Sequence, residues 1–225
     1  MTYETKIIDR QEVAQGTYEV SFIRPVGYSF KAGQYTQIRL PQLTAPDAKG
    51  PSRLFSITSP SSDTKVLRIV FRHSGSGFKT TLLESKDTNV LIESPAGNLV
   101  LPDQPRRPLV FVAGGVGISP FISYLFDAVP NPWSFPIALY YGNQNPQSAA
   151  YAHELKVMAS CQKQFTLHEM FKRPESQLFA SLAKKHSEAL WVVVGPPGMV
   201  ANCKAGLISG GITSADILTE SFEGY

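Results

Sequence analysis

The sequence predicts a two-domain fold, an antiparallel β-barrel followed by a doubly wound α/β domain with a parallel sheet. In the first hundred of its 225 residues, apolar side chains alternate in short runs between turn residues, which is typical of antiparallel strands. After a polar, proline-bearing segment at 101–108, strands alternate with longer helical segments, which is typical of a parallel sheet with helices on both faces. The length suits two domains of about 100 to 120 residues, and we expect them over 1–103 and 104–225.

The barrel strands are predicted from period-two alternation. Tyr18, Val20 and Phe22 alternate in one segment, and the residues between them would face the other side of the sheet. Glycine and proline separate the strands, and residues 41–51 are expected to be an exposed loop. A short helix is expected at 80–84. The predicted strands of this half are 17–23, 35–40, 53–59, 66–72 and 90–93.

In the second half, strands and helices are predicted in strict alternation. The strands are short apolar runs, and the helices begin near proline, serine or glutamate residues that suit a first turn. The predicted strands are 109–113, 137–141, 164–171, 190–194 and 217–218, and the helices follow Pro120, Ser148, Glu175 and Pro197.

Composition excludes several classes of protein. The formal charge is +3 with scattered basic residues, so no nucleic-acid partner is expected. No apolar run approaches the ~20 residues that span a bilayer, and residues 1–10 are too polar for a signal peptide, so we expect a cytoplasmic protein without a membrane span. With only Cys161 and Cys203, neither a disulfide framework nor a four-cysteine metal site is expected.

The segment 109–120, LVFVAGGVGISP, is the most informative motif. An apolar strand breaks into closely spaced glycines, which permit positive φ and close approach of a ligand to the backbone. Ser119 and Pro120 suit the start of a helix. Free N–H groups and the helix dipole at such a start favour a pyrophosphate, so the segment predicts a nucleotide site.

This motif departs from the usual dinucleotide fingerprint. Gly115 and Gly117 fit G-x-G-x-x-G, but Pro120 occupies the place of the third glycine. The next predicted strand, 137–141, is followed by Gly-Asn-Gln without the carboxylate that holds a ribose. An ordinary nicotinamide dehydrogenase is therefore disfavoured.

Three more segments carry chemistry. Arg53 and Ser56 flank Phe55 near a strand end, an arrangement that is weak by itself because a cation beside a ring is usually surface packing. Residues 74–79, SGSGFK, form a second glycine-rich helix start able to receive phosphate. Residues 193–200, VVGPPGMV, again indicate a strand, a tight turn and a helix.

Together and in this order, these motifs resemble the ferredoxin-NADP reductase superfamily over essentially the whole chain. The family pattern Arg-x-Tyr/Phe-Ser matches 53–56, its phosphate-side loop matches 75–79, its G-x-G-x-x-P turn matches 115–120, and its G-x-P-x-M turn matches 195–199. The resemblance implies an FAD-binding barrel followed by an NAD(P)-binding α/β domain. It also implies an FAD-dependent NAD(P)H oxidoreductase without an iron–sulfur domain.

The resemblance further implies the site residues. Ser56 would place its hydroxyl near flavin N5, which accepts hydride, and Tyr225 would lie on the isoalloxazine ring; these are the predicted catalytic residues. Arg53 would neutralise the FAD pyrophosphate, and backbone N–H groups around Gly77 and Phe78 would complete that site. The predicted cofactor-binding residues are Arg53, Leu54, Phe55, Ser56, Phe71, Arg72, Gly77, Phe78, Lys79, Gly115, Gly117, Ser119, Gly195, Pro197 and Met199.

The function implied first is hydride transfer from NAD(P)H to bound FAD, followed by electron transfer to a protein acceptor such as ferredoxin or flavodoxin. Two other functions fit the same motifs: reduction of free flavin as a diffusing substrate, and a non-catalytic electron-transfer or nucleotide-sensing subunit of a larger complex. NADH and NADPH stay equally open. Gln144 stands where relatives often have an arginine for the 2′-phosphate, whereas Lys172 and Arg173 end the following strand.

Overall fold

The computed structural model describes residues 1–102, 106–127, 133–172 and 174–222. The chain divides into two compact units. The first comprises Met1–Leu101 and Ser119–Asp127, and the second comprises Pro102–Ile118 and Ala128–Tyr225. The domain boundary predicted at 103/104 falls outside the described residues and stays a prediction.

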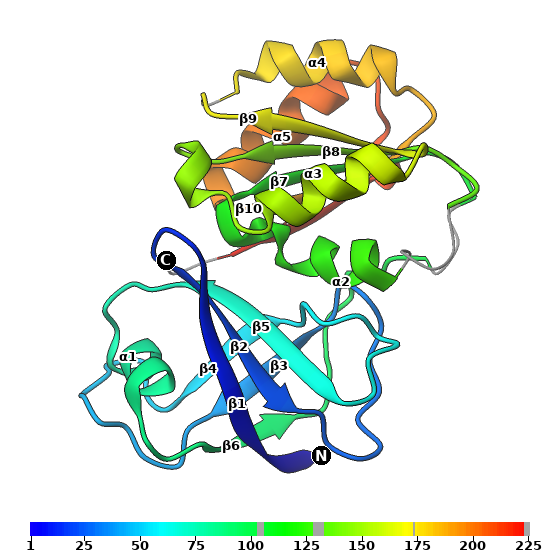
Figure 1. The fold of residues 1–225 in the computed structure, drawn as a ribbon. Coiled ribbons are helices and arrows are strands. Elements are labelled where there is room, and N and C mark those ends of the chain that lie inside the picture. Colours follow the sequence, from blue (N-terminus) through cyan, green and yellow to red (C-terminus); the bar gives the residue numbers. More distant parts are fainter. Residues whose placement is uncertain (103–105, 128–132, 173, 223–225) are drawn as a thin grey trace. The chain divides into compact units, whose positions relative to one another are not determined.

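The first unit is an antiparallel barrel, as predicted (Figure 1). Its strand order is β4-β3-β6-β1-β2-β5, and every neighbouring pair is antiparallel. An isolated bridge between Ile57 and Ile69 links the chain just after β4 to β5, so the two end strands of the sheet meet. The elements are β1 (Thr2–Ala14), β2 (Thr17–Ile23), β3 (Tyr35–Arg39), β4 (Ser52–Ser56), β5 (Val66–Arg72), α1 (Gly77–Glu84) and β6 (Asn89–Glu93).

Strand β1 is the one barrel strand that the sequence pattern did not predict. It lies in the middle of the sheet, between β6 and β2. Its inward residues alternate only from Tyr3 through Thr5 to Ile7, and the register then shifts between Ile7 and Asp9. A bulge adds one residue to a strand and interrupts its period of two, which hides the strand from a search for alternation.

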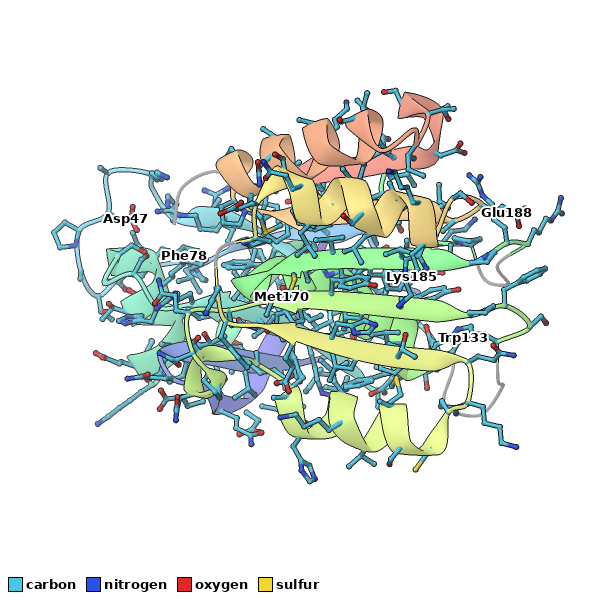
Figure 2. All side chains as sticks on the ribbon, turned by 90° about the horizontal axis from the view of Figure 1, so that it is seen from above. Asp47, Phe78, Trp133, Met170, Lys185 and Glu188 are labelled. Atoms are coloured by element: carbon cyan, nitrogen blue, oxygen red, sulfur yellow. The ribbon has the colours of Figure 1, made fainter. Side chains whose placement is uncertain are left out.

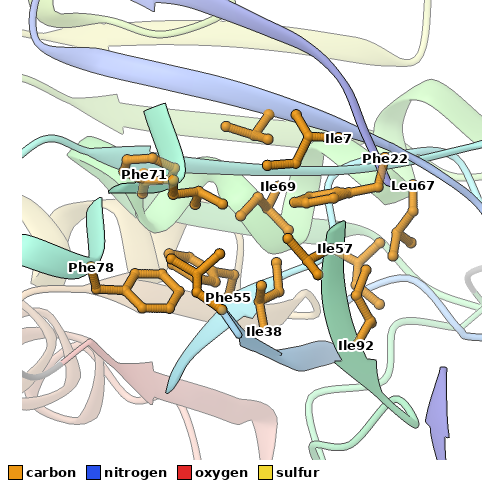
Figure 3. Close-up of a cluster of buried hydrophobic side chains, with 14 of the residues drawn as sticks. Ile7, Phe22, Ile38, Phe55, Ile57, Leu67, Ile69, Phe71, Phe78 and Ile92 are labelled. Atoms are coloured by element: carbon orange, nitrogen blue, oxygen red, sulfur yellow. The ribbon is translucent and has the colours of Figure 1, made fainter. Parts of the chain in front are cut away.

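Aromatic and branched side chains fill the barrel (Figure 3). Phe22, Ile38 and Ile57 are wholly buried there. Phe78 is also wholly buried, and it carries the first turn of α1 into the same core. The position of the α1 N-terminus is therefore fixed by burial of a large aromatic side chain, which contributes on the order of 1.5 to 3 kcal/mol.

Helix α2 (Ser119–Asp127) groups with the first unit. At its end, the Asp127 carboxylate accepts hydrogen bonds from the backbone N–H groups of Ser61, at 2.6 Å, and Ser62, at 3.1 Å. Burial opposes ionisation of Asp127, but these hydrogen bonds outweigh it and lower the pKa of the carboxyl group. The turn at Ser61 and Ser62 therefore anchors the helix through an ionised side chain.

The second unit is a parallel five-stranded sheet with the order β11-β10-β7-β8-β9, which confirms the predicted doubly wound α/β fold. Helix α3 covers one face, and α4 and α5 cover the other (Figures 1 and 2). The elements are β7 (Leu109–Gly114), β8 (Ile137–Gly142), α3 (Ala152–Cys161), β9 (Phe165–Met170), α4 (Ser176–Lys185), β10 (Leu190–Gly195), α5 (Pro197–Ser209) and β11 (Ile217–Ser221).

The core under α4 and α5 is built around Trp191 and Phe179, both wholly buried. Cys203 lies in this core, and burial raises the pKa of its thiol. Cys203 and the exposed Cys161 are both free, as the cysteine count predicted.

Close packing of α4 on α5 depends on glycine within a helix. A Cβ at Gly206 would lie 2.4 Å from the Ser176 carbonyl oxygen and 2.8 Å from Phe179 Cβ. We expect Gly206→Ala to lower the free energy of unfolding by about 1 to 3 kcal/mol through overpacking, although alanine is the better helix former by ~1 kcal/mol. Urea unfolding checks this, with Ser209→Ala at an exposed position of α5 as the control. A stabilised Gly206→Ala protein would show that helix propensity outweighs the packing.

Candidate functional site

The barrel brings several predicted site residues together beside the N-terminus of α1. The Arg53 guanidinium carbon lies 5.2 Å from the centroid of the Phe78 ring. The Phe55 ring stacks on Phe78 with centroids 6.0 Å apart, and it contacts Phe71 at 5.5 Å. Residues that are far apart in the sequence, on β4, β5 and α1, thus form one cluster of a cation and three rings.

The structure already places an anion on the predicted phosphate donors. Arg53 Nη2 donates a hydrogen bond to Asp47 Oδ1, and the backbone N–H of Phe78 donates to Asp47 Oδ2 at 2.9 Å. The hydrogen bond from Phe78, with those from Lys49 and Arg53, lowers the pKa of Asp47 to about 2. The donor set therefore fits an anion such as phosphate, and the chain supplies a carboxylate to it.

Asp47 was missed because it lies in the segment 41–51, which the sequence predicts to be an exposed loop. Only 5% of its side chain is exposed. The available signal was an acidic residue six positions before the arginine of the motif, in a proline-bounded loop long enough to fold back. Sequence spacing alone does not show that such a loop closes on a helix that begins thirty residues later.

The glycine of the second phosphate motif is explained by contact with this same loop. A Cβ at Gly77 would lie 2.3 Å from the Pro46 carbonyl oxygen and 2.4 Å from that of Ala45. Ser76 caps α1 by accepting a hydrogen bond from the Lys79 N–H at 3.3 Å. Lys79 is buried, and its ammonium group donates to the Arg72 carbonyl oxygen at 2.8 Å. Gly77 thus admits chain backbone where the motif predicts a phosphate.

The two faces of β4 differ sharply. Phe55 points into the barrel core and is 8% exposed, whereas Leu54 on the opposite face is 59% exposed. Ser56 shares the face of Leu54, and its buried Oγ has no hydrogen-bond partner among the described residues. Leu54 and Ser56, with Ser52 at the start of the strand, are therefore the β4 side chains on the face away from the core. The predicted role of Phe55 in cofactor binding stays a prediction.

In the second unit, the two predicted nucleotide turns pack against each other at the carboxyl ends of β7 and β10. A Cβ at Gly114 would lie 2.5 Å from Met199 Sδ, and one at Gly195 would lie 2.7 Å from Met199 Cε. Met199 therefore occupies the space left by both glycines. Pro197 begins α5, and the N-terminus of this helix has no side-chain cap.

The positions 115 and 117 are glycine for different structural reasons. Gly115 adopts a φ of +54°, and nothing lies within 4 Å of its Cβ position, so its surroundings are open. A Cβ at Gly117 would lie 2.3 Å from the Val194 carbonyl oxygen. Ser119, predicted as a cap, is instead the buried first residue of α2, because residues Gly115–Ile118 form a 3₁₀ turn before it.

Polar groups that the sequence did not single out gather at the carboxyl ends of β8 and β9. Tyr141 and Glu169 are register partners, and Asn143 follows β8 directly. The Tyr141 hydroxyl, both amide atoms of Asn143 and Glu169 Oε1 are buried without a hydrogen-bond partner in the described part of the chain. Lys156 pairs with the other oxygen of Glu169 at 2.9 Å. This edge of a parallel sheet is where nucleotides bind in such folds.

Glu220 is a second acid that the sequence analysis missed. It lies on β11 opposite Val194, and its buried Oε2 has no hydrogen-bond partner among the residues described. Burial raises the pKa of this carboxyl group. Two residues of the sequence analysis, Tyr225 and Arg173, lie outside the described residues. No helix in the described part is long and apolar enough to cross a membrane.

Comparison with known proteins shows what this chain is similar to. Residues 111–205 match the family model of the oxidoreductase NAD-binding domain. Ferredoxin-NADP+ reductase from Plasmodium falciparum superposes with a TM-score of 0.80 at 18% identity, covering 98% of this chain and 96% of that one. A reductase component of terephthalate 1,2-dioxygenase from Comamonas sp is 35% identical over 135 residues, which are 57% of this chain and 38% of that protein. A probable flavin reductase from Photobacterium leiognathi is 28% identical over 170 residues, 71% of this chain and 68% of that one.

The fold is shared with a ferredoxin-NADP+ reductase, and the matched domain is an oxidoreductase NAD-binding domain, so both findings agree with the resemblance to the ferredoxin-NADP reductase superfamily. The predicted cofactors, FAD and a nicotinamide dinucleotide, agree with the matched domain and with the flavin reductase relative. Most of the residues that match the oxidoreductase NAD-binding domain lie in the second unit, and Ser119–Asp127 lie in the first. The chain spans about two fifths of the length of the dioxygenase reductase component that it matches.

Packing of the Gly117 turn on β10 predicts a stability effect. We expect Gly117→Ala to lower the free energy of unfolding by about 1 to 3 kcal/mol, because the new Cβ meets backbone that cannot rotate away. Gly142→Ala is the matched control, since a Cβ there lies 3.6 Å from the Ala113 carbonyl oxygen, an ordinary contact. Urea unfolding of both variants checks this. Equal stabilities would mean that the turn shifts freely away from Val194.

Buried Glu220 predicts a pH-dependent effect. Its raised pKa means that the ionised carboxylate destabilises the fold, so the stability from the protonated form is present below its ordinary pKa of 4.5 and is lost as pH rises through the raised value. We therefore expect Glu220→Gln to leave the melting temperature unchanged near pH 4 and to raise it near pH 8. Thermal melts across this range, with exposed Glu188→Gln as control, check the sign. A difference that does not grow with pH would contradict it.

Proposed function

We propose that this chain catalyses hydride transfer from NAD(P)H to a flavin and passes the electrons on to an acceptor. The observation that carries the proposal is the donor pair of Arg53 and the Phe78 N–H beside a cluster of aromatic rings. The second unit adds a matched NAD-binding domain. A flavin, when bound, supplies the redox chemistry, and the protein orients the reactants and excludes water.

Each unit contributes its own groups. In the barrel, the exposed Leu54 presents the face of β4 that is directed away from the core, where a planar ring can lie, and the buried Ser56 Oγ without a described partner lies on the same face. In the α/β unit, the open surroundings of Gly115 and the uncapped N-terminus of α5 offer backbone N–H groups to a pyrophosphate. The orphaned polar atoms at Tyr141 and Asn143 suit the hydroxyl groups of a nucleoside.

A protein acceptor is the first candidate for the electrons, because several similar proteins are named as reductase or electron transfer components of oxygenases. A small acidic carrier such as ferredoxin or flavodoxin would dock on basic side chains. Arg72 and Arg106 are exposed, whereas Arg107 pairs with Asp216 at 2.6 Å and Lys79 is buried. The two exposed arginines are therefore the cations to test for docking.

Free flavin is the second candidate acceptor, and one observation favours it. Asp47 occupies the donors that would hold the pyrophosphate of a resident FAD. The flavin reductase relative also matches this chain over similar fractions of both proteins. Retention of flavin after gel filtration, and reduction of free flavin compared with ferredoxin or flavodoxin under anaerobic NADH or NADPH, distinguish the two acceptors. A protein that reduces neither a bound nor a free flavin would overturn the proposed function.

The phosphate role of Arg53 predicts a binding defect. We expect Arg53→Ala to weaken FAD affinity by about tenfold or more, because the Asp47 carboxylate then loses its cationic partner and stands uncompensated beside the anionic phosphates of the ligand. Quenching of flavin fluorescence gives the dissociation constant. Lys65→Ala removes the same charge at an exposed position before β5, at the opposite end of that strand from Arg72, and serves as control. Unchanged FAD affinity in the folded Arg53→Ala variant would remove Arg53 from the site.

A further inference from the structure

We propose that Asp47 is a specificity-determining residue of the flavin site, an internal anion that disfavours flavins with phosphate groups and leaves uncharged riboflavin as the preferred flavin. The inference rests on the proposed function, since it assumes that flavin binds beside Arg53. It concerns the loop of residues 41–51, for which the sequence motifs assign no role.

The contacts of Asp47 are those of a phosphate group. One carboxylate oxygen accepts from the Arg53 guanidinium and from the Lys49 N–H at 2.9 Å. The other accepts from the Phe78 N–H at 2.9 Å, in the first turn of α1. An arginine and a helix N-terminus are the two donors that most often bind phosphate in proteins. Asp47 therefore satisfies the same groups that a flavin phosphate needs.

The loop is fixed in this position by contacts on both sides of Asp47. Thr44 donates its N–H to the Thr81 hydroxyl oxygen at 2.9 Å, which ties the loop to α1. Arg53 Nη1 donates to the carbonyl oxygens of Lys49, Gly50 and Ser52 at 3.0, 2.9 and 2.7 Å. Figure 2 shows Asp47 on this loop, on the side of the barrel where Phe78 lies.

The glycine at 77 makes this arrangement possible. Its missing side chain leaves room for the Pro46 carbonyl oxygen, 2.3 Å from where a Cβ would be. The loop thus packs on the helix start by backbone contact, and a phosphate reaches the Phe78 N–H only if the loop and its hydrogen bonds move. Moving the loop lowers the affinity for a flavin that carries a phosphate, whereas riboflavin can bind without moving it.

The negative charge of Asp47 further lowers the affinity for flavins that carry phosphate groups. The low pKa of Asp47 keeps its carboxylate ionised throughout the neutral range. The phosphate of FMN and the pyrophosphate of FAD are both anionic, so each meets a like charge at close range. Riboflavin has the same ring system and carries no charge. The structure therefore predicts discrimination by the phosphate and not by the ring.

The test is the dissociation constant of riboflavin, FMN and FAD, measured by fluorescence quenching on the full chain and on Asp47→Asn. The asparagine variant removes the negative charge and with it the ion pair to Arg53. We expect it to tighten FMN and FAD by about tenfold, the effect of one charge-assisted hydrogen bond, and to leave riboflavin within about twofold. Unchanged riboflavin affinity also shows that the variant is folded, and Asp47→Ala with a melting curve gives a second reading.

Two further variants make the test specific. Asp87→Asn removes the same charge from an exposed turn, where the carboxylate also accepts a backbone N–H, at 2.9 Å from Asn89, so it controls for net charge. In the double variant Asp47→Asn, Arg53→Gln, the gain for FMN and FAD should disappear, because that gain depends on the released guanidinium group.

The possible outcomes separate the two claims. If riboflavin binds and the preference among the three flavins is the same in Asp47→Asn and Asp87→Asn, the inference is overturned and the flavin site stands. If the native chain binds FAD more tightly than riboflavin, the inference is overturned as well. If no flavin binds to any variant, the proposed function fails and the inference fails with it.

Discussion

The Asp47 carboxylate, held between the Arg53 guanidinium and the first turn of α1, is the interaction on which the barrel half of the site depends. It joins β4, the loop after β3 and the helix. Because an arginine and a helix N-terminus both require an anion, a chain without a bound phosphate must leave them to solvent or supply its own charge. This chain supplies its own. The hydrogen bonds of Asp47 to Arg53 and Phe78 order the loop, and they lower the affinity that we expect for a phosphorylated flavin.

Glycine at the motif positions has two separate uses in this protein. At Gly77 and Gly117, a side chain would collide with backbone carbonyl oxygens, so packing of the chain on itself already requires glycine; at Gly114 and Gly195 it would meet the flexible end of the Met199 side chain. At Gly115 the surroundings are open and φ is positive, so the residue serves the turn and leaves a free approach. A glycine-rich motif is therefore an ambiguous sign of ligand contact, and the neighbouring atoms decide its meaning.

The α/β unit carries partly buried acidic side chains that its sequence pattern does not predict. Glu169 on β9 and Glu220 on β11 lie near the carboxyl ends of the two edge strands of the sheet. Glu169 pairs with Lys156, and Glu220 has an oxygen without a partner among the described residues. Burying such a group costs stability unless it is compensated. That cost is common where a fold keeps polar groups for a ligand, and this edge is where parallel sheets bind nucleotides.

The sequence by itself determined the class of both units, because alternation with a period of two and alternation of strands with helices are local properties of the chain. It also located the four motifs, since glycine, proline and serine act on the turns in which they stand. Tertiary structure decided the rest. Strand β1 became central despite the bulge after Ile7, because partners on both sides satisfy its backbone. Asp47 reached Phe78 across thirty-one positions because loop closure and burial, which depend on the whole fold, brought them together.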